Sequence, residues 1–188
     1  MHALIAALLF LAQPFWETKP PEQWTDREID VMRGTSPWTQ SIPPSPELLV
    51  WFATAEPVEA AEAEARLRKR NPLHQPDPDY LDFLRENREK AFVLAIEYPT
   101  LSGLSKEADP WKTLEKETSM TVGGRAYRVE GEFPPTPSDP VLRLVFPRSV
   151  TINDKSVKFE LYLPGLPFPE RAAEFRVKDL LYRGKLAI

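Results

Sequence analysis

Cysteine is absent from the 188 residues of this chain. The absence excludes thiol nucleophiles, disulfide bonds, a lipid-modified N-terminal cysteine, and the zinc sites and iron–sulfur clusters that depend on cysteine. A chain of this length can bury a self-sufficient hydrophobic core as one domain, so its stability requires no disulfide.

Histidine is scarce, because His74 is the only one beyond the first twelve residues. A Ser-His-Asp triad would have to use it, and the sequence has neither a Gly-x-Ser-x-Gly elbow nor a Ser-x-x-Lys pair. Ser102 is therefore interpreted as a loop serine, and we do not expect a serine hydrolase.

The best metal-like cluster combines His74 with Asp77 and Asp79. Their spacing matches neither the zinc nor the calcium patterns. Asp77 is better explained as the N-cap of a helix, and Asp79 as an acidic residue of its first turn. The sequence therefore predicts no metal site and no cofactor.

The chain also lacks an excess of positive charge, with a net charge of -4 and a pI near 5.4. Binding to nucleic acid depends on a basic field, so nucleic acid is not an expected partner. The one strongly basic run, residues 66–70, would suit a phosphate group. It is more simply the basic end of a helix, where cations complement the helix dipole.

The longest apolar run, residues 3–12, ends abruptly at Gln13-Pro14. Such a run is typical of an export signal peptide, which we assign to residues 1–12. It is too short for a membrane anchor, which needs about 20 residues, so no stable membrane span is expected. These features predict a periplasmic or secreted protein. The alternative is an N-terminal helix packed on the domain.

Residues 13–45 are rich in proline and tryptophan, and we interpret them as an arm laid over a larger body. Thr25 and Glu28 form the pattern of a capping box, which predicts a short helix to Met32. The remaining residues, 46–188, are assigned to a single domain.

Apolar runs and helix caps outline the first half of that domain. Residues 48–54 and 91–98 are continuous apolar runs typical of buried strands. Between them, Pro57 and the charge order predict a helix over 58–70, and Asp77-Pro78 opens a second helix to about Lys90.

The C-terminal half changes to strand patterns. A possible short helix begins at Asp109-Pro110, and Gly123-Gly124 predicts a hairpin turn. The predicted strands cover residues 118–122, 125–133, 141–146, 157–163, 173–177 and 186–188. We therefore expect an α+β domain, with a mostly antiparallel β-sheet in the C-terminal half and helices segregated in the N-terminal half.

Four tryptophans in proline-rich or loop contexts are candidates for a binding surface: Trp16, Trp24, Trp38 and Trp111. Exposed aromatic side chains would recognise a protein or a glycan. The more common alternative is that they pack into their own domain.

Glu97 is an acid inside an apolar strand, where burial would raise the pKa of its carboxyl group. A hydrolase needs only two carboxylates that converge in space, and the sequence is silent on such pairing. The simpler interpretation places Glu97 at the solvent-exposed end of its strand, beside Pro99.

Several short phrases stand out near the two ends of the chain. They are Gln23-Trp24-Thr25, Ser36-Pro37-Trp38, Val145-Phe146-Pro147-Arg148, and the segment from Phe175 to Leu186. Together they resemble a group of small secreted bacterial proteins of unknown function, which carry a tryptophan-capped helix, a Ser-Pro-Trp turn and a C-terminal Lys-Asp-x-x-Tyr-x-Gly-Lys-Leu phrase. The resemblance implies export and a single domain, and it implies no catalytic residue.

The expected function is therefore that of an exported bacterial domain that acts by binding, with a protein or glycan partner, or by a structural role in the envelope or outside the cell. Two alternatives stay open. One is a hydrolase whose carboxylates converge around Glu97 or the His74 loop. The other is a carrier of a small apolar ligand, with a pocket between sheet and helices.

Overall fold

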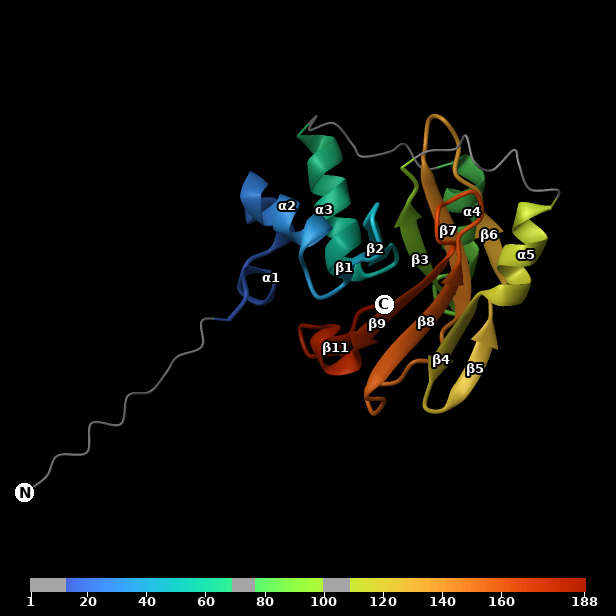
Figure 1. The fold of residues 1–188 in the computed structure, drawn as a ribbon. Helices are drawn as coiled ribbons and strands as arrows, with labels where there is room; N and C mark the ends of the chain where they lie inside the picture. Colours follow the sequence, from blue (N-terminus) through green and yellow to red (C-terminus); the bar gives the residue numbers. More distant parts are fainter. Residues whose placement is uncertain (1–12, 69–76, 100–108) are drawn as a thin grey trace, which may run out of the picture.

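The computed structural model describes residues 13–68, 77–99 and 109–188 (Figure 1). The predicted signal peptide, His74 and Ser102 lie outside these residues. The helices described are α1 (Phe15–Thr18), α2 (Asp26–Gly34), α3 (Glu56–Leu67), α4 (Pro78–Asn87) and α5 (Pro110–Glu117), with short 3-10 turns η1 (Pro21–Gln23) and η3 (Val177–Asp179).

The strands described form three sheets in which all neighbouring strands are antiparallel. A five-stranded sheet has the order β1 (Thr39–Ile42), β2 (Leu48–Phe52), β3 (Ala91–Glu97), β7 (Val141–Pro147), β6 (Gly131–Phe133); a four-stranded sheet has the order β5 (Arg125–Arg128), β4 (Ser119–Val122), β8 (Ser156–Tyr162), β9 (Glu170–Arg176); β10 (Leu181–Tyr182) pairs with β11 (Lys185–Leu186). The predicted α+β class is confirmed, with helices mostly in the N-terminal half.

The main core lies between the two large sheets. Phe52 of β2 packs against Phe159 of β8 and Phe175 of β9, with ring centroids 5.9 Å and 4.7 Å apart. Edge-to-face contacts of this kind add to the large apolar area that each ring buries. Along β8 and β9, buried and exposed residues alternate, as the sequence predicts for strands with one face in water.

Strands β3 and β7 are buried along almost their whole length because both faces of the five-stranded sheet are covered. On the outer face, Tyr80 of α4 packs in a second apolar cluster with Val93 of β3 and Val145 of β7. The apolar runs over residues 91–98 and 141–146 are therefore explained by the two covering layers, whereas in β2 buried and half-buried residues alternate.

Helix caps fall where the sequence predicts them. The Thr25 hydroxyl accepts a hydrogen bond from the Glu28 backbone, and the Glu28 carboxylate accepts one from the Thr25 backbone, at 3.2 Å and 2.7 Å. Asp77 accepts a hydrogen bond from the Asp79 backbone at 2.8 Å, which confirms its predicted role as a cap. The helix expected to open at residue 58 begins at Glu56, with Pro57 in its first turn.

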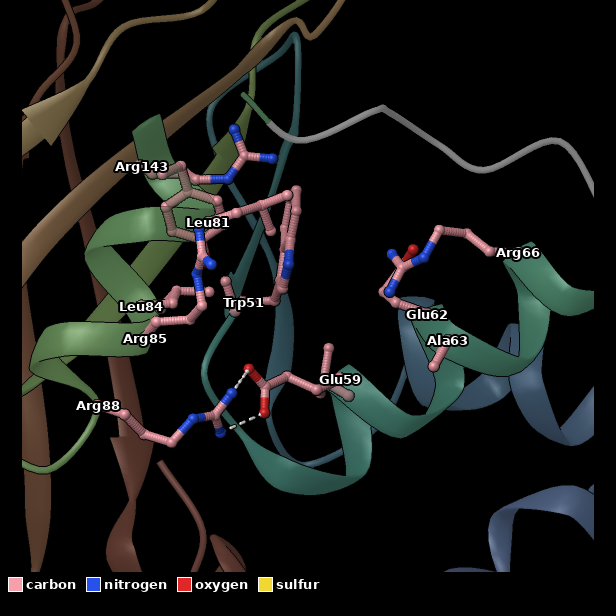
Figure 2. Close-up of a pocket in the computed structure, with 13 residues that line it drawn as sticks. Trp51, Glu59, Glu62, Ala63, Arg66, Leu81, Leu84, Arg85, Arg88 and Arg143 are labelled. Carbon is pink, nitrogen blue, oxygen red and sulfur yellow. Dashed lines mark hydrogen bonds and ion pairs between the residues drawn. The ribbon is translucent and has the colours of Figure 1, made fainter. Parts of the chain in front are cut away.

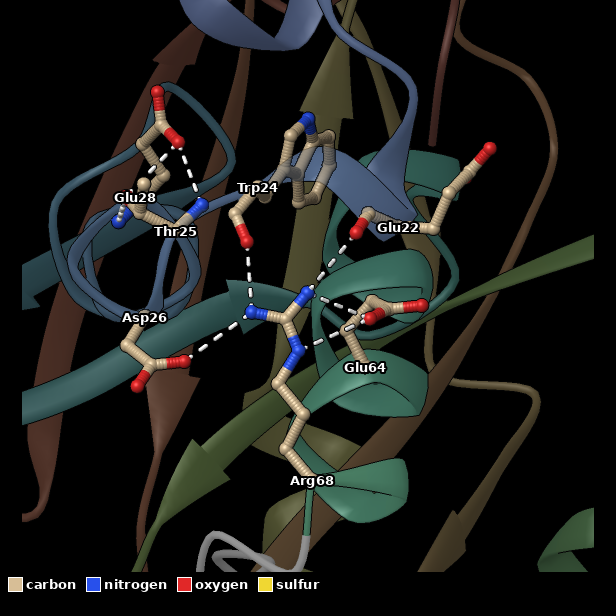
Figure 3. Close-up of polar contacts among 7 residues, drawn as sticks. All are labelled: Glu22, Trp24, Thr25, Asp26, Glu28, Glu64 and Arg68. Carbon is tan, nitrogen blue, oxygen red and sulfur yellow. Dashed lines mark hydrogen bonds and ion pairs between the residues drawn. The ribbon is translucent and has the colours of Figure 1, made fainter.

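Residues 13–45 are part of the core and not a layer over it. Trp24, Met32 and Trp38 are fully buried in the main cluster, and the strand β1, which the sequence analysis does not predict, extends the five-stranded sheet. Figure 3 shows how Arg68 holds this segment to α3: its guanidinium donates to the Trp24 carbonyl at 2.7 Å and to Glu64 at 2.8 Å.

The predicted strand over residues 125–133 is wrong as a single element. Its first part, β5, stays in the four-stranded sheet, whereas β6 crosses to the edge of the other sheet, where Gly131 is in register with Val145. The chain therefore switches from the four-stranded to the five-stranded sheet between these two strands. The predicted antiparallel strands of the C-terminal half are thus divided between the two large sheets.

Candidate functional site

The α3–α4 groove is a cavity of about 610 Å³ that lies between helices α3 and α4 on the outer face of the five-stranded sheet (Figure 2). Its apolar lining consists of Trp51, Ala53, Val58, Ala63, Leu81 and Leu84. Its polar lining consists of Tyr80, Glu59, Glu62, Arg66, Arg85, Arg88 and Arg143.

Strand register places Trp51 and Arg143 on the same face of the five-stranded sheet. Trp51 of β2, Ala95 of β3 and Arg143 of β7 are neighbours in one row across the sheet. Because side chains alternate along a strand, all three face away from the inter-sheet core. Ala95 is fully buried between them, whereas Trp51 is half-buried and lines the groove.

Arg143 forms the most buried polar contact of the groove. Its guanidinium donates to both carboxylate oxygens of Asp139, at 2.6 Å and 3.3 Å, and the two side chains are 7% and 5% exposed. The same guanidinium lies 4.5 Å from the centre of the Tyr80 ring. Burial raises the pKa of Tyr80 to about 12, so its phenol is protonated at neutral pH.

A second ion pair joins the two helices. The Arg88 guanidinium donates to both carboxylate oxygens of Glu59, at 2.6 Å and 2.7 Å, and Figure 2 shows this pair bridging the groove. Glu62 forms an ion pair with Arg33, with 2.7 Å between Glu62 Oε1 and Arg33 Nε. Both carboxylates that line the groove are therefore neutralised by arginines.

The two remaining arginines lie at the mouth of the groove. Arg85 of α4 is paired with Asp82 on the surface, where its side chain is 75% exposed. Arg66 of α3 has no ion-pair partner in residues 13–68, 77–99 and 109–188. In Figure 2 the Arg66 side chain extends from α3 and its guanidinium overlaps Glu62 in this view. The mouth of the groove therefore carries positive charge.

The structure does not expose two of the four tryptophans proposed as a binding surface. Trp24 is 1% exposed and Trp38 is 0% exposed, so neither ring can contact a partner in this fold. Their indole N–H groups donate to the carbonyls of Lys19 and Leu180, at 3.1 Å and 3.3 Å. Both rings belong to the core, and their burial leaves no indole N–H without an acceptor.

The other two candidate tryptophans, Trp16 and Trp111, are half-buried and pack against the main core. Trp16 also lines a second hollow of about 620 Å³, together with the Ser36-Pro37 turn and the edge of β9. Both side chains are partly exposed and remain available for contact with a partner. Neither is among the residues that line the α3–α4 groove.

Of the two places considered for catalysis, Glu97 lies within the described residues and the His74 loop lies outside them. Glu97 is the last residue of β3, opposite Val141, where it is partly buried, and it lines neither cavity. Burial raises the pKa of Glu132, and the nearby Glu115 raises it further, but this pair also lies outside both cavities. Within the described part of the chain, no three His, Asp or Glu side chains are placed to hold a metal ion.

Sequence reasoning missed Trp51 and Arg143. Trp51 lies inside the apolar run 48–54 and is interpreted from the sequence as part of a buried strand. Strand alternation places its side chain on the other face of the sheet from Val50 and Phe52. Arg143 interrupts the apolar run of β7, and this single charge in a buried strand is the signal that could have identified the outer face.

Comparison with known proteins finds no matching family model, no matching curated protein and no matching solved structure. The resemblance to small secreted bacterial proteins therefore stays a prediction. Among the described residues, no helix combines the length and apolarity needed to cross a membrane.

Proposed function

We propose that the protein is a non-catalytic binding domain that holds a small, largely apolar ligand in the α3–α4 groove. The supporting observation is the half-buried Trp51 at the base of a cavity of about 610 Å³. Pockets for small ligands commonly measure about 300–1,000 Å³ and are lined mostly by apolar and aromatic side chains.

The polar groups of the groove favour binding over catalysis. A general base needs a free carboxylate or a side chain that titrates near neutral pH. Glu59 and Glu62 are both held in ion pairs, and the pKa of Tyr80 is about 12. These groups are suited to orienting a ligand, because each is fixed in place.

We also propose, from the apolar run over residues 3–12, that the protein acts in the periplasm or outside the cell. N-terminal sequencing of the protein recovered from fractionated cells tests this. A mature N-terminus near Gln13 in the periplasm or medium is expected. Cytoplasmic protein that retains Met1 would contradict it.

A neutral apolar dye, N-phenyl-1-naphthylamine, tests the groove itself. Its fluorescence should rise on binding to the wild-type protein. Ala63→Phe should weaken the rise, because Ala63 is an exposed residue of the groove wall and the added ring occupies part of the cavity. Ala126→Phe is the matched control, since Ala126 is exposed on β5, outside the groove. Equal dye binding by both variants would contradict the proposal.

A further inference from the structure

The charges around the α3–α4 groove are not balanced. Four arginines and two glutamates line it. Arg88 is neutralised by Glu59, and Arg143 by Asp139 from outside the lining. Glu62 is already occupied by Arg33, so no carboxylate of the lining remains for Arg66 or Arg85.

Arg66 and Arg85 come from opposite walls. Arg66 projects from the last turn of α3, and Arg85 from the last turn of α4. Within residues 13–68, 77–99 and 109–188, Arg85 forms one ion pair, with Asp82 on its own helix, and both side chains are more than half exposed. An exposed pair of this kind contributes little to stability, so a ligand can replace Asp82 at little cost.

Apolar surface lies directly beside these two cations. Leu81 is 45% exposed although it lines the groove, and Trp51 is half-buried below it. In Figure 2 the Trp51 ring stands between the wall formed by α4 and the Arg66 side chain. Apolar side chains and these two cations therefore line the same groove.

We infer that the ligand of this groove is an amphipathic oxyanion, with an apolar body on Trp51 and Leu81 and a carboxylate or phosphate group between Arg66 and Arg85. Guanidinium groups bind both oxyanions through paired, charge-assisted hydrogen bonds. The inference rests on the proposed binding function and adds the charge and the orientation of the ligand.

Three naphthalene compounds of similar size test the inference by isothermal titration calorimetry at low salt. They are 1-naphthylacetate, its neutral amide 1-naphthaleneacetamide, and 1-naphthyl phosphate. The wild-type protein should bind at least one of the two anions about tenfold more tightly than the amide, as expected for charge-assisted hydrogen bonds. The preferred anion then identifies the head group.

The Arg66→Gln and Arg85→Gln variants should each reduce the preference for the anion, and the double variant should abolish it, while affinity for the amide stays unchanged. Arg27→Gln is the matched control, because Arg27 is an exposed arginine on α2 outside the groove. Circular dichroism and thermal unfolding establish that each variant is folded. Equal affinity for anions and amide, or a preference that survives in the double variant, would overturn the inference.

The neutral dye separates this inference from the proposed function. If the dye binds the wild-type protein more tightly than Ala63→Phe, and the anions show no advantage, only the charge of the ligand is wrong. If neither the dye nor any naphthalene compound binds, both the groove and its ligand class are rejected.

Discussion

The two faces of the five-stranded sheet are built from alternate residues of the same strands, yet they have opposite characters. The inner face places Phe52, Leu94 and Leu144 in one register row, and all three are fully buried. The outer face is only partly covered by α4 and carries Trp51 and Arg143. The difference shows that the inner face is stabilised by apolar packing alone, whereas the outer face combines apolar packing with a buried ion pair and a groove.

The largest predicted effect comes from neighbouring residues on opposite faces. Phe52→Ala should lower the free energy of unfolding by about 3–5 kcal/mol, since it removes a ring that packs on three others. Trp51→Ala should cost less, because Trp51 is half-buried, but it should weaken dye binding. Urea unfolding and dye titration measure the two effects. Equal destabilisation by both variants would remove the distinction between the faces.

The next effect concerns the one strongly buried ion pair on the outer face. Arg143→Met should cost about 3 kcal/mol, because it leaves the Asp139 carboxylate buried without its cation. The double variant Arg143→Met/Asp139→Leu should recover part of this stability, because it also removes the buried carboxylate of Asp139. A double-mutant cycle of urea unfolding checks the coupling, and simple additivity would argue against it.

A smaller effect, confined to acid, is expected at a polar site away from both faces. The hydrogen bond from Lys19, followed by that from the Thr25 backbone, lowers the pKa of Glu28 from 4.5 to about 2. A carboxyl group whose pKa is lowered by folding stabilises the native state above its unfolded pKa. This contribution is lost as the pH falls from about 4.5 to about 2.

Glu28→Gln should therefore lower the thermal midpoint at pH 7 more than at pH 2. Thermal unfolding of both proteins between pH 7 and pH 2 measures the difference. The same loss at every pH would show that the carboxylate makes no electrostatic contribution.

The smallest change in stability is expected at the edge of the groove. Glu59→Gln should cost less than about 1 kcal/mol, because Arg88 and Glu59 form a partly exposed pair. It should also release the Arg88 guanidinium into the groove and strengthen binding of 1-naphthylacetate, with no change for the amide. Calorimetry with both compounds checks this. Weaker binding of the anion would contradict this and would mean that the Arg88–Glu59 ion pair is needed to keep the shape of the groove.

Features set by neighbouring residues could be predicted from the sequence. The capping box at Thr25 and Glu28 depends on four consecutive residues, and the alternation along β8 depends on residues two apart. The switch of β6 to the other sheet could not be predicted, because Arg125 to Phe133 reads as one strand pattern while its two parts pair with β4 and β7.

The candidate site was less accessible to sequence reasoning than the fold. Residue type alone does not distinguish Trp24, which is core, from Trp51, which lines the groove. The groove also brings Tyr80 against Arg143 across 63 positions of sequence, a contact that only the packing of α4 on β7 creates. Arg66, interpreted as the basic end of a helix, acquires its position at the mouth in the same way.

The most direct test of the account is the response of the five tryptophan indole N–H signals to 1-naphthylacetate in ¹H–¹⁵N NMR spectra. We expect the Trp51 signal to shift with ligand concentration, together with backbone amides of α3 and α4, while the buried Trp24 and Trp38 signals stay in place. An unchanged Trp51 signal, with shifts at Trp16 or Trp111 instead, would contradict it.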